Sequence, residues 1–398
     1  MNIKTLRNLL CVCVCTASFL PVSVSAQIST DQLDGRINTI NTAVPFLRID
    51  PDARSGAMGD VGISLSADAN SIYWNTAKLS FADAPTALSV TYTPWLKELV
   101  NDIFLADVSG YKKLNDGDQA ITASLRYFSL GSITFTNFTG QIIGNFNPRE
   151  FTFTAGYSRK IADNFSTGIN LGYIYSNLAS GQSVNNVPIK PGIAAAADIS
   201  FMYHKDFKMK DSKQKSYYNI GLTISNIGNK ITYTQSAENK DFIPTNLGIG
   251  GGPTFNFDEY NSLHIGAEIN KLLVPTPDSA GNFRTLSVPA GIISSFSDAP
   301  GGAKEELHEL MYSAGTEYWY KSQFAIRAGY FNEHATKGNR KYLTAGIGIK
   351  YNVFGLNFSY LIPTSNQKNP LDNTLRFSLI FDFKEKNVKA PDNNTTTE

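Results

Sequence analysis

Hydrophobic side chains recur at every second residue through most of this chain. Between residues 165 and 175, Phe, Thr, Ile, Leu, Tyr and Tyr alternate with small or polar residues. Successive side chains of a strand leave opposite faces of a sheet, so each such run has one apolar face and one small, polar face. Runs of this kind extend from Thr86 to Phe383 and number about fourteen, an even count that is typical of bacterial barrels. The pattern predicts an all-β fold, an outer-membrane antiparallel β-barrel over residues 86–383.

The connections between these runs alternate in length. If the first strand runs outward, the even-numbered strands end in short turns, as at Ala162-Asp163-Asn164 and Asn352-Val353. Long connections fall at the other end, over residues 131–149, 178–191, 227–243 and 273–306. Outer-membrane barrels have short periplasmic turns and longer extracellular loops. This parity therefore predicts that the start of the first strand and the end of the last strand both lie on the periplasmic side.

Composition agrees with a membrane barrel and excludes one class of partner. Aromatic residues make up 12% of the chain and charged residues 17%, the latter below the roughly 25% of soluble domains. The formal net charge is +1, which does not suggest a nucleic-acid partner. Outer-membrane lipid is the partner that this composition predicts.

The two ends of the chain are predicted to lie outside the barrel. Residues 1–26 combine two basic residues, an apolar run and a Val-Ser-Ala end, which predicts a secretory signal peptide. Its apolar run is shorter than the roughly 18 residues that a membrane span needs. All three cysteines, at positions 11, 13 and 15, lie in it. Residues 384–398 are polar and are expected to form a periplasmic tail.

Residues 27–85 do not alternate and are predicted to fill the barrel as an N-terminal hatch, because a barrel of this size encloses more space than its wall side chains occupy. Buried charges need partners, so polar residues on the inner faces of strands should bond this hatch; a hydrophilic pore is the other interpretation. The expected lumen-lining residues are Arg126, His264, Glu268, Glu317, Arg327 and Arg376.

The hatch segment carries the motifs of a known family. The stretch Ala67-Asp68-Ala69-Asn70-Ser71-Ile72-Tyr73-Trp74-Asn75-Thr76-Ala77-Lys78-Leu79 resembles the hatch of FadL-type outer-membrane proteins, with Thr76 where that pattern usually has Pro. The stretch Pro51 to Asp60, together with Trp74-Asn75, resembles the PorV family of the type IX secretion system, and a PorQ-like or other FadL-like paralogue would fit in part. The motif residues are Asp52, Arg54, Gly56, Gly59, Asp60, Asp68, Trp74 and Asn75.

The resemblance implies a non-enzymatic transport role in the outer membrane. PorV-like proteins associate with the type IX translocon barrel, receive the C-terminal domains of secreted cargo proteins, and pass them to an attachment complex that contains the sortase PorU. A protein-sized partner needs loop surface, which we expect from aromatic residues of the long loops. They are Phe135, Phe138, Phe146, Tyr233, Phe242 and Phe283.

Two other functions remain open at this stage. A FadL-type channel for hydrophobic small molecules would share the fold, and would depend on an apolar pocket near Trp74 or Phe81. An outer-membrane hydrolase could use His308 among the nearby glutamates. We expect neither catalysis nor a cofactor or metal, since the predicted mature chain has no cysteine and its four histidines are far apart in the sequence.

Overall fold

A computed structural model describes residues 38–95, 102–114, 117–136, 139–184, 187–210, 212–234, 240–277, 282–364 and 374–383. The predicted signal peptide, the predicted C-terminal tail and Phe138 lie outside these residues.

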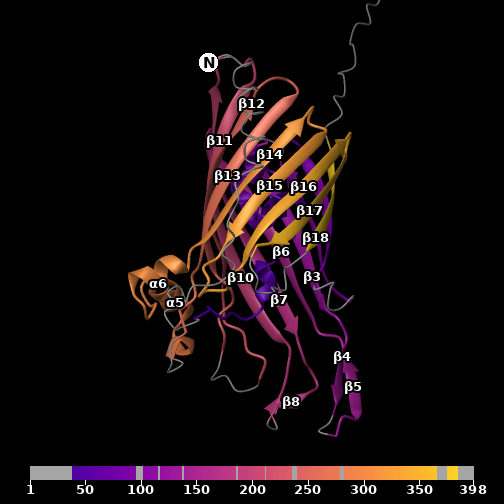
Figure 1. Ribbon diagram of the computed structural model, residues 1–398, viewed down its shortest axis with the longest axis vertical. Coiled ribbons are helices and arrows are strands. Elements are labelled where there is room, and N and C mark those ends of the chain that lie inside the picture. The colour runs from indigo at the N-terminus through magenta and orange to yellow at the C-terminus, as the bar shows by residue number, and fades with distance from the viewer. Residues whose placement is uncertain are drawn as a thin grey trace, which may run out of the picture.

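Within the described residues, fourteen antiparallel strands close into one barrel, which confirms the predicted fold class and strand number (Figure 1). Closure is made by the first and last strands, with Thr86 opposite Phe383. The strands are β1 (Thr86–Pro94), β2 (Ile103–Lys113), β3 (Gln119–Leu130), β6 (Arg149–Ala162), β7 (Phe165–Asn177), β10 (Gly192–Lys208), β11 (Lys215–Gly228), β12 (Asn246–Asn256), β13 (Asn261–Leu272), β14 (Met311–Tyr320), β15 (Phe324–Asn332), β16 (Lys341–Tyr351), β17 (Phe354–Pro363) and β18 (Leu375–Phe383).

The sequence alternation becomes the two faces of the wall. On β7, Ile169 and Leu171 point outward with 49% and 66% of their surface exposed, while Asn170 between them and Ser166 on the same inner face are buried. The same contrast holds on β16, where Leu343 and Ile347 are exposed and Thr344 is buried. The outer face is therefore apolar, as contact with lipid tails requires.

The long connections gather at one end of the barrel and the short turns at the other. At the long-loop end, two small hairpins pair only with themselves, β4 (Ile133–Thr136) with β5 (Ile142–Phe146) and β8 (Ser183–Val184) with β9 (Val187–Pro188). The connection between β13 and β14 contains η4 (Asn282–Thr285), α5 (Val288–Ser294) and α6 (Ala303–His308). Figure 1 shows α5 and α6 beside the barrel wall at this end. None of the described helices is both long and apolar enough to span a bilayer.

Residues 44–81 lie inside the barrel and include four short helices, η2 (Pro45–Arg48), α3 (Ala53–Gly56), α4 (Ser71–Trp74) and η3 (Thr76–Phe81). They contact strands on opposite sides of the wall: α3 packs against β16, β17 and β18, and η3 against β6, β7 and β10. Most residues from 44 to 80 are buried. We call residues 50–81 the plug.

Above the plug, at the long-loop end, lies an apolar layer that we call the stopper, residues 44–49. Val44, Phe46, Leu47 and Ile49 are buried in one cluster with side chains from the long-loop ends of the strands, Leu105, Phe128, Ile174, Leu272, Met311, Phe331, Tyr342 and Leu361. The ring of Phe46 stacks on Phe128 with centroids 6.4 Å apart. The stopper therefore packs an apolar layer across this end of the lumen.

Glycines allow the plug backbone to touch the wall. Gly59 has a φ of +69° and leaves no room for a side chain against the backbone of Tyr330. A Cβ atom on Gly315 or Gly329 would overlap the backbone of Met58. The chain thus meets strands β14 and β15 at backbone contact distance, which only glycine permits.

We predict that Gly329→Val will disturb the seating of the plug, while Ala328→Val, on the exposed outer face of the same strand, will not. Overpacking of a tight interior contact costs about 1–3 kcal/mol. The measurement is the temperature at which the folded, fast-migrating form is lost on a denaturing gel. Equal midpoints for the two variants would contradict the close approach of Met58 to β15.

Candidate functional site

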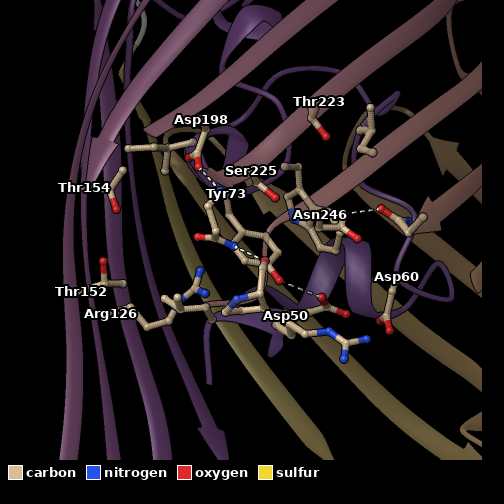
Figure 2. A pocket seen from close by; sticks show the side chains of 18 of the residues that line it. Asp50, Asp60, Tyr73, Arg126, Thr152, Thr154, Asp198, Thr223, Ser225 and Asn246 are labelled. Atoms are coloured by element: carbon tan, nitrogen blue, oxygen red, sulfur yellow. Dashed lines mark hydrogen bonds between the residues drawn. The ribbon is translucent and has the colours of Figure 1, made fainter. Parts of the chain in front are cut away.

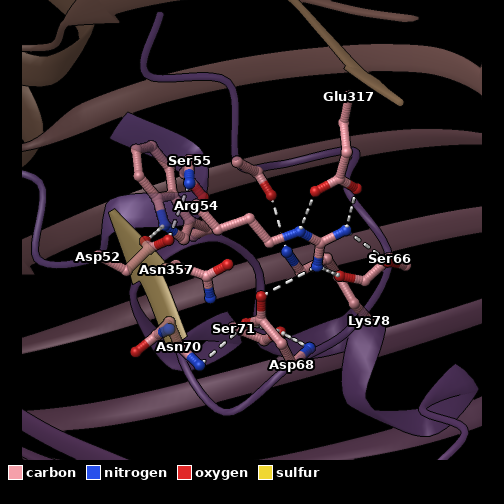
Figure 3. Close-up of polar contacts among 12 residues, drawn as sticks. Asp52, Arg54, Ser55, Ser66, Asp68, Asn70, Ser71, Lys78, Glu317 and Asn357 are labelled. Atoms are coloured by element: carbon pink, nitrogen blue, oxygen red, sulfur yellow. Dashed lines mark hydrogen bonds and ion pairs between the residues drawn. The ribbon is translucent and has the colours of Figure 1, made fainter. Parts of the chain in front are cut away.

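A charged clamp fixes the centre of the plug to the wall (Figure 3). The guanidinium of Arg54 donates from Nε and Nη2 to Glu317 on β14, at 2.9 and 2.7 Å, and from Nη1 to Asp68 at 3.0 Å. Glu317 also accepts from Arg327 Nε at 2.7 Å. Burial alone would lower the pKa of Arg54, but the charges of Glu317 and Asp68 raise it above its ordinary value. This clamp brings together four residues that the sequence singled out, and it holds the plug.

A second group of contacts organises the plug internally. Asp52 caps α3 by accepting from the Ser55 amide at 2.8 Å, and it accepts from Trp74 Nε1 at 2.6 Å. Burial, with Asp68 nearby, raises the pKa of Asp52. Lys78 donates to the Gly62 carbonyl at 2.7 Å, and burial lowers its pKa to about 8. The motif residues therefore serve the plug's own structure.

The far side of the plug is bonded to strands β7, β10 and β13. Asn75 caps η3 through the Ala77 amide at 3.0 Å and donates to the carbonyl of Phe201 at 3.1 Å. Thr76, where the FadL-type pattern usually has Pro, donates to Asn170 Oδ1 at 2.8 Å. Glu268 accepts from the backbone amides of Gly62, at 2.7 Å, and Ile63. His264 is also buried in the wall and bonds Thr254 at 2.8 Å.

Asp60 and Arg376 lie near the stopper. The Tyr342 hydroxyl donates to Asp60, and the Arg376 guanidinium lies 4.0 Å from Asp50. Gly56 leaves room for the Arg376 side chain, which a Cβ atom would meet. Burial and the neighbouring Asp60 raise the pKa of Asp50 well above its ordinary value.

Between stopper and plug lies a polar chamber of about 140 Å³ (Figure 2). Its lining includes Arg48, Arg126 and Arg340 as well as Asp50, Asp60 and Asp198. Arg126 bonds Asp107 at 3.3 Å, and its guanidinium lies 4.3 Å from the ring centroid of Tyr73. Pockets for drug-sized apolar ligands are typically 300–1,000 Å³ and mostly hydrophobic. The chamber is too small and too charged for such a ligand.

Beneath the plug, at the short-turn end, is a larger vestibule of about 1170 Å³. Its lining mixes charged residues such as Arg54, Asp68 and Lys350 with Trp319. Phe81 is outside both linings and lies 5.0 Å from the His204 ring. Trp74 lines the chamber. Trp74 and Phe81 therefore do not line the same one of these two cavities, which are formed by residues that the structure describes.

Among the residues that the structure describes, no group of three or more His, Asp or Glu side chains is arranged to hold a metal ion. The glutamates near His308 are engaged by lysines: Glu306 and Glu309 by Lys271, and Glu305 and Glu309 by Lys337. The ring of His308 stacks on His334, with centroids 3.6 Å apart. These contacts fasten α6 to the barrel.

The aromatic loop residues occupy different environments. Phe135 and Phe146 pack on each other across the β4–β5 hairpin at 6.4 Å, and Phe283 is half-buried in η4. Tyr233 bonds Ser176 and packs against the stopper cluster. Phe242 is only 4% exposed and lies against Gly291 and Lys230. The expectation that Phe242 offers contact surface is therefore wrong, because the α5 segment covers it.

The exposed apolar surface of the loops is made by residues that the aromatic pattern did not single out. Ile293 and Phe296, at the end of α5, are 72% and 52% exposed, and Leu307 on α6 is 63% exposed. Ile142 on the β4–β5 hairpin is 70% exposed. Phe296 lies two residues past the end of α5, so helical periodicity gives no signal that would have paired it with Ile293.

These features define the class: a fourteen-stranded outer-membrane barrel with residues 44–81 packed inside it. Long loops of such barrels face outward, so the long-loop end is extracellular. The sequence-family model described as type IX secretion system protein PorV matches residues 31–279, which is more than half of the sequence. The chain belongs to the PorV family and is a component of the type IX secretion system.

Solved structures give a more distant likeness. The TodX deltaS2S3 mutant monoaromatic hydrocarbon channel is 13% identical with a TM-score of 0.49, over 83% of this chain and 99% of that one. A Pseudomonas aeruginosa FadL homologue is 12% identical with a TM-score of 0.42, over 87% and 99% of the two chains. No curated protein matches the chain.

Proposed function

We propose that this protein is a non-enzymatic cargo carrier of the type IX secretion system. It binds the C-terminal domains of secreted proteins at the translocon barrel and delivers them to the attachment complex that contains the sortase PorU. Family membership supports the role in secretion. The observation that carries the finer proposal is the exposed apolar surface of Ile142, Ile293, Phe296 and Leu307 at the extracellular end.

A stable protein interface buries about 800 Å² on each partner. The outer face of the barrel wall contacts lipid and the plug lies across the lumen, so this area must come from the loops. Contiguous exposed apolar surface marks sites of protein contact. The α5–α6 segment contributes three large apolar side chains that are more than half exposed, and the β4–β5 hairpin contributes one.

A FadL-type channel is the alternative with the same fold. The polar chamber argues against it, because an apolar ligand there would contact the charged side chains of Arg48, Arg126 and Arg340 without offering them hydrogen bonds. The stopper packs apolar side chains across the route from outside. We therefore propose that the extracellular loops carry out the cargo-binding function.

Deletion of the β4–β5 hairpin tests the loop proposal without harm to the barrel, since the hairpin forms its own two-stranded sheet. We expect replacement of residues 133–146 by a short turn to lower the amount of cargo at the cell surface severalfold. The barrel should keep its heat-modifiable migration. Unchanged cargo display would remove the hairpin from the proposed interface.

A further inference from the structure

One side of the polar chamber is built from hydrogen-bond donors. Figure 2 shows Arg126 of β3 beside Thr152 and Thr154 of β6 on this side. The two strands pair so that Arg126 stands opposite Thr152, and Ser124 stands opposite Thr154. Residues directly opposite each other in an antiparallel pair share a face, with Cβ atoms about 4.5–5.5 Å apart. One guanidinium and three hydroxyls therefore form a compact group, which we call the donor block.

The guanidinium of Arg126 is held at one edge and open at the other. Its Nε donates to Asp107 at 3.3 Å, and its plane lies 4.3 Å from the ring centroid of Tyr73 in the plug. Its terminal nitrogens, Nη1 and Nη2, bond no acceptor among the residues that the structure describes. Arg126 is nevertheless only 4% exposed. These two nitrogens are thus buried donors that line the chamber, and their planar fork matches the oxygens of a carboxylate or phosphate.

The two threonine hydroxyls of the donor block converge beside a glycine. A Cβ atom at Gly172 of β7 would lie 3.4 Å from Thr154 Oγ1 and 3.8 Å from Thr152 Oγ1. Glycine leaves that space open to the chamber. About 10–15 Å³ is enough for one water-sized molecule, so the 140 Å³ of the chamber has room for a small oxyanion.

The carboxylates that line the chamber have donors of their own. Asp198 accepts from Asn226 and Asn170, Asp60 accepts from Tyr342, and Asp50 accepts from Tyr73. The lining carries three arginines and three aspartates, so its total charge does not select the sign of a ligand. The local donors select it, and they are gathered in the donor block.

We propose that the donor block binds a small oxyanion, a phosphate, sulfate or carboxylate group, with Arg126 as its charged anchor. Hydrogen bonds between a guanidinium and an ionised oxygen are among the strong ones in proteins. The bound anion fixes the guanidinium over the ring of Tyr73. The site is therefore built by the wall, and its occupation stabilises the plug.

Equilibrium dialysis of the full, detergent-solubilised protein against labelled inorganic phosphate tests this proposal. We expect saturable uptake of one phosphate per barrel, and competition by sulfate or acetate distinguishes a tetrahedral ligand from a carboxylate. An anion enclosed during assembly would exchange slowly, so the oxyanions released on denaturation are measured on the same sample. Absence of both uptake and release would overturn the proposal.

Two variants locate the site. Arg126→Gln should weaken phosphate binding at least tenfold, because a hydrogen bond to a charged group exceeds the free energy of a tenfold change in affinity. Gly172→Val should weaken it as strongly by filling the space beside the hydroxyls. Gly172→Val leaves the donor block and its contact with the plug unchanged, so it remains decisive if Arg126→Gln does not fold. Wild-type affinity in Gly172→Val would overturn the proposal.

Thr152→Val and Thr223→Val form a matched pair, since each removes one hydroxyl that lines the chamber. Thr223 is on β11, which β7 and β10 separate from β6. We expect severalfold weaker phosphate binding with Thr152→Val and no change with Thr223→Val. Equal losses would mean that the donor block is not the site. The loops proposed to bind cargo do not enter this measurement, so its outcome is independent of the proposed function.

Discussion

Glu317→Gln should destabilise the plugged barrel more than any other single charge change at the plug. Its carboxylate accepts from two arginines, Arg54 of the plug and Arg327 of the wall, and is 2% exposed. Loss of one member of a buried ion pair costs about 3–5 kcal/mol, because the remaining charges stay desolvated without compensation. The measurement is the midpoint of unfolding of the detergent-solubilised protein, followed by gel migration.

The matched control is Asp241→Asn, which removes the charge from the pair with Arg284. Both of those side chains are more than 40% exposed, at 46% and 41%, and exposed pairs contribute about 0–1 kcal/mol. The two variants make the same chemical change, so their difference reports burial. Equal midpoints would mean that the Arg54 clamp does not hold the plug.

The double variant Ile293→Asp with Phe296→Asp should abolish cargo capture while the barrel stays folded. Both side chains are exposed at the end of α5, so their loss leaves no cavity. Apolar residues at the centre of an interface contribute about 2 kcal/mol or more each when they are hot spots. A tenfold or greater fall in captured cargo is then expected, since about 1.4 kcal/mol is tenfold in affinity.

The control for this variant is Ser297→Asp, which adds a charge at an exposed neighbouring position without removal of apolar surface. Point changes are preferable to deletion of the whole loop. Deletion of α6 would remove Glu306 and Glu305, which pair with Lys271 and Lys337, and the barrel itself would then be affected. Normal capture by the double variant would exclude the α5 face as the cargo surface.

The sequence predicted the barrel because its wall obeys one simple rule. Residues such as Leu171 face lipid and their neighbours face the lumen, so alternation fixes the register of each strand. The inner polar residues were also predictable. A charged side chain such as Arg327, on the face of the strand with small and polar residues, points into the lumen, and a charge buried there needs an ion-pair or hydrogen-bond partner.

The loops could not be predicted in the same way, since they have no repeating face. Phe242 and Ile293 are both apolar loop residues, but Phe242 is buried beneath α5, whereas Ile293 on that helix is exposed. Their difference depends on how α5 and α6 fold back, which the lysine and glutamate contacts decide. The division between stopper and plug likewise appears only when residues 44–49 meet side chains from distant strands.

The most direct test of the carrier function is identification of the proteins that co-purify with this barrel after gentle detergent extraction of the outer membrane. We expect the large translocon barrel and a set of secreted proteins that share a C-terminal domain to co-purify with this protein. These partners should be lost or reduced with Ile293→Asp/Phe296→Asp and retained with Ser297→Asp. Recovery of the barrel without protein partners, with hydrophobic small molecules bound in its lumen, would contradict the carrier function.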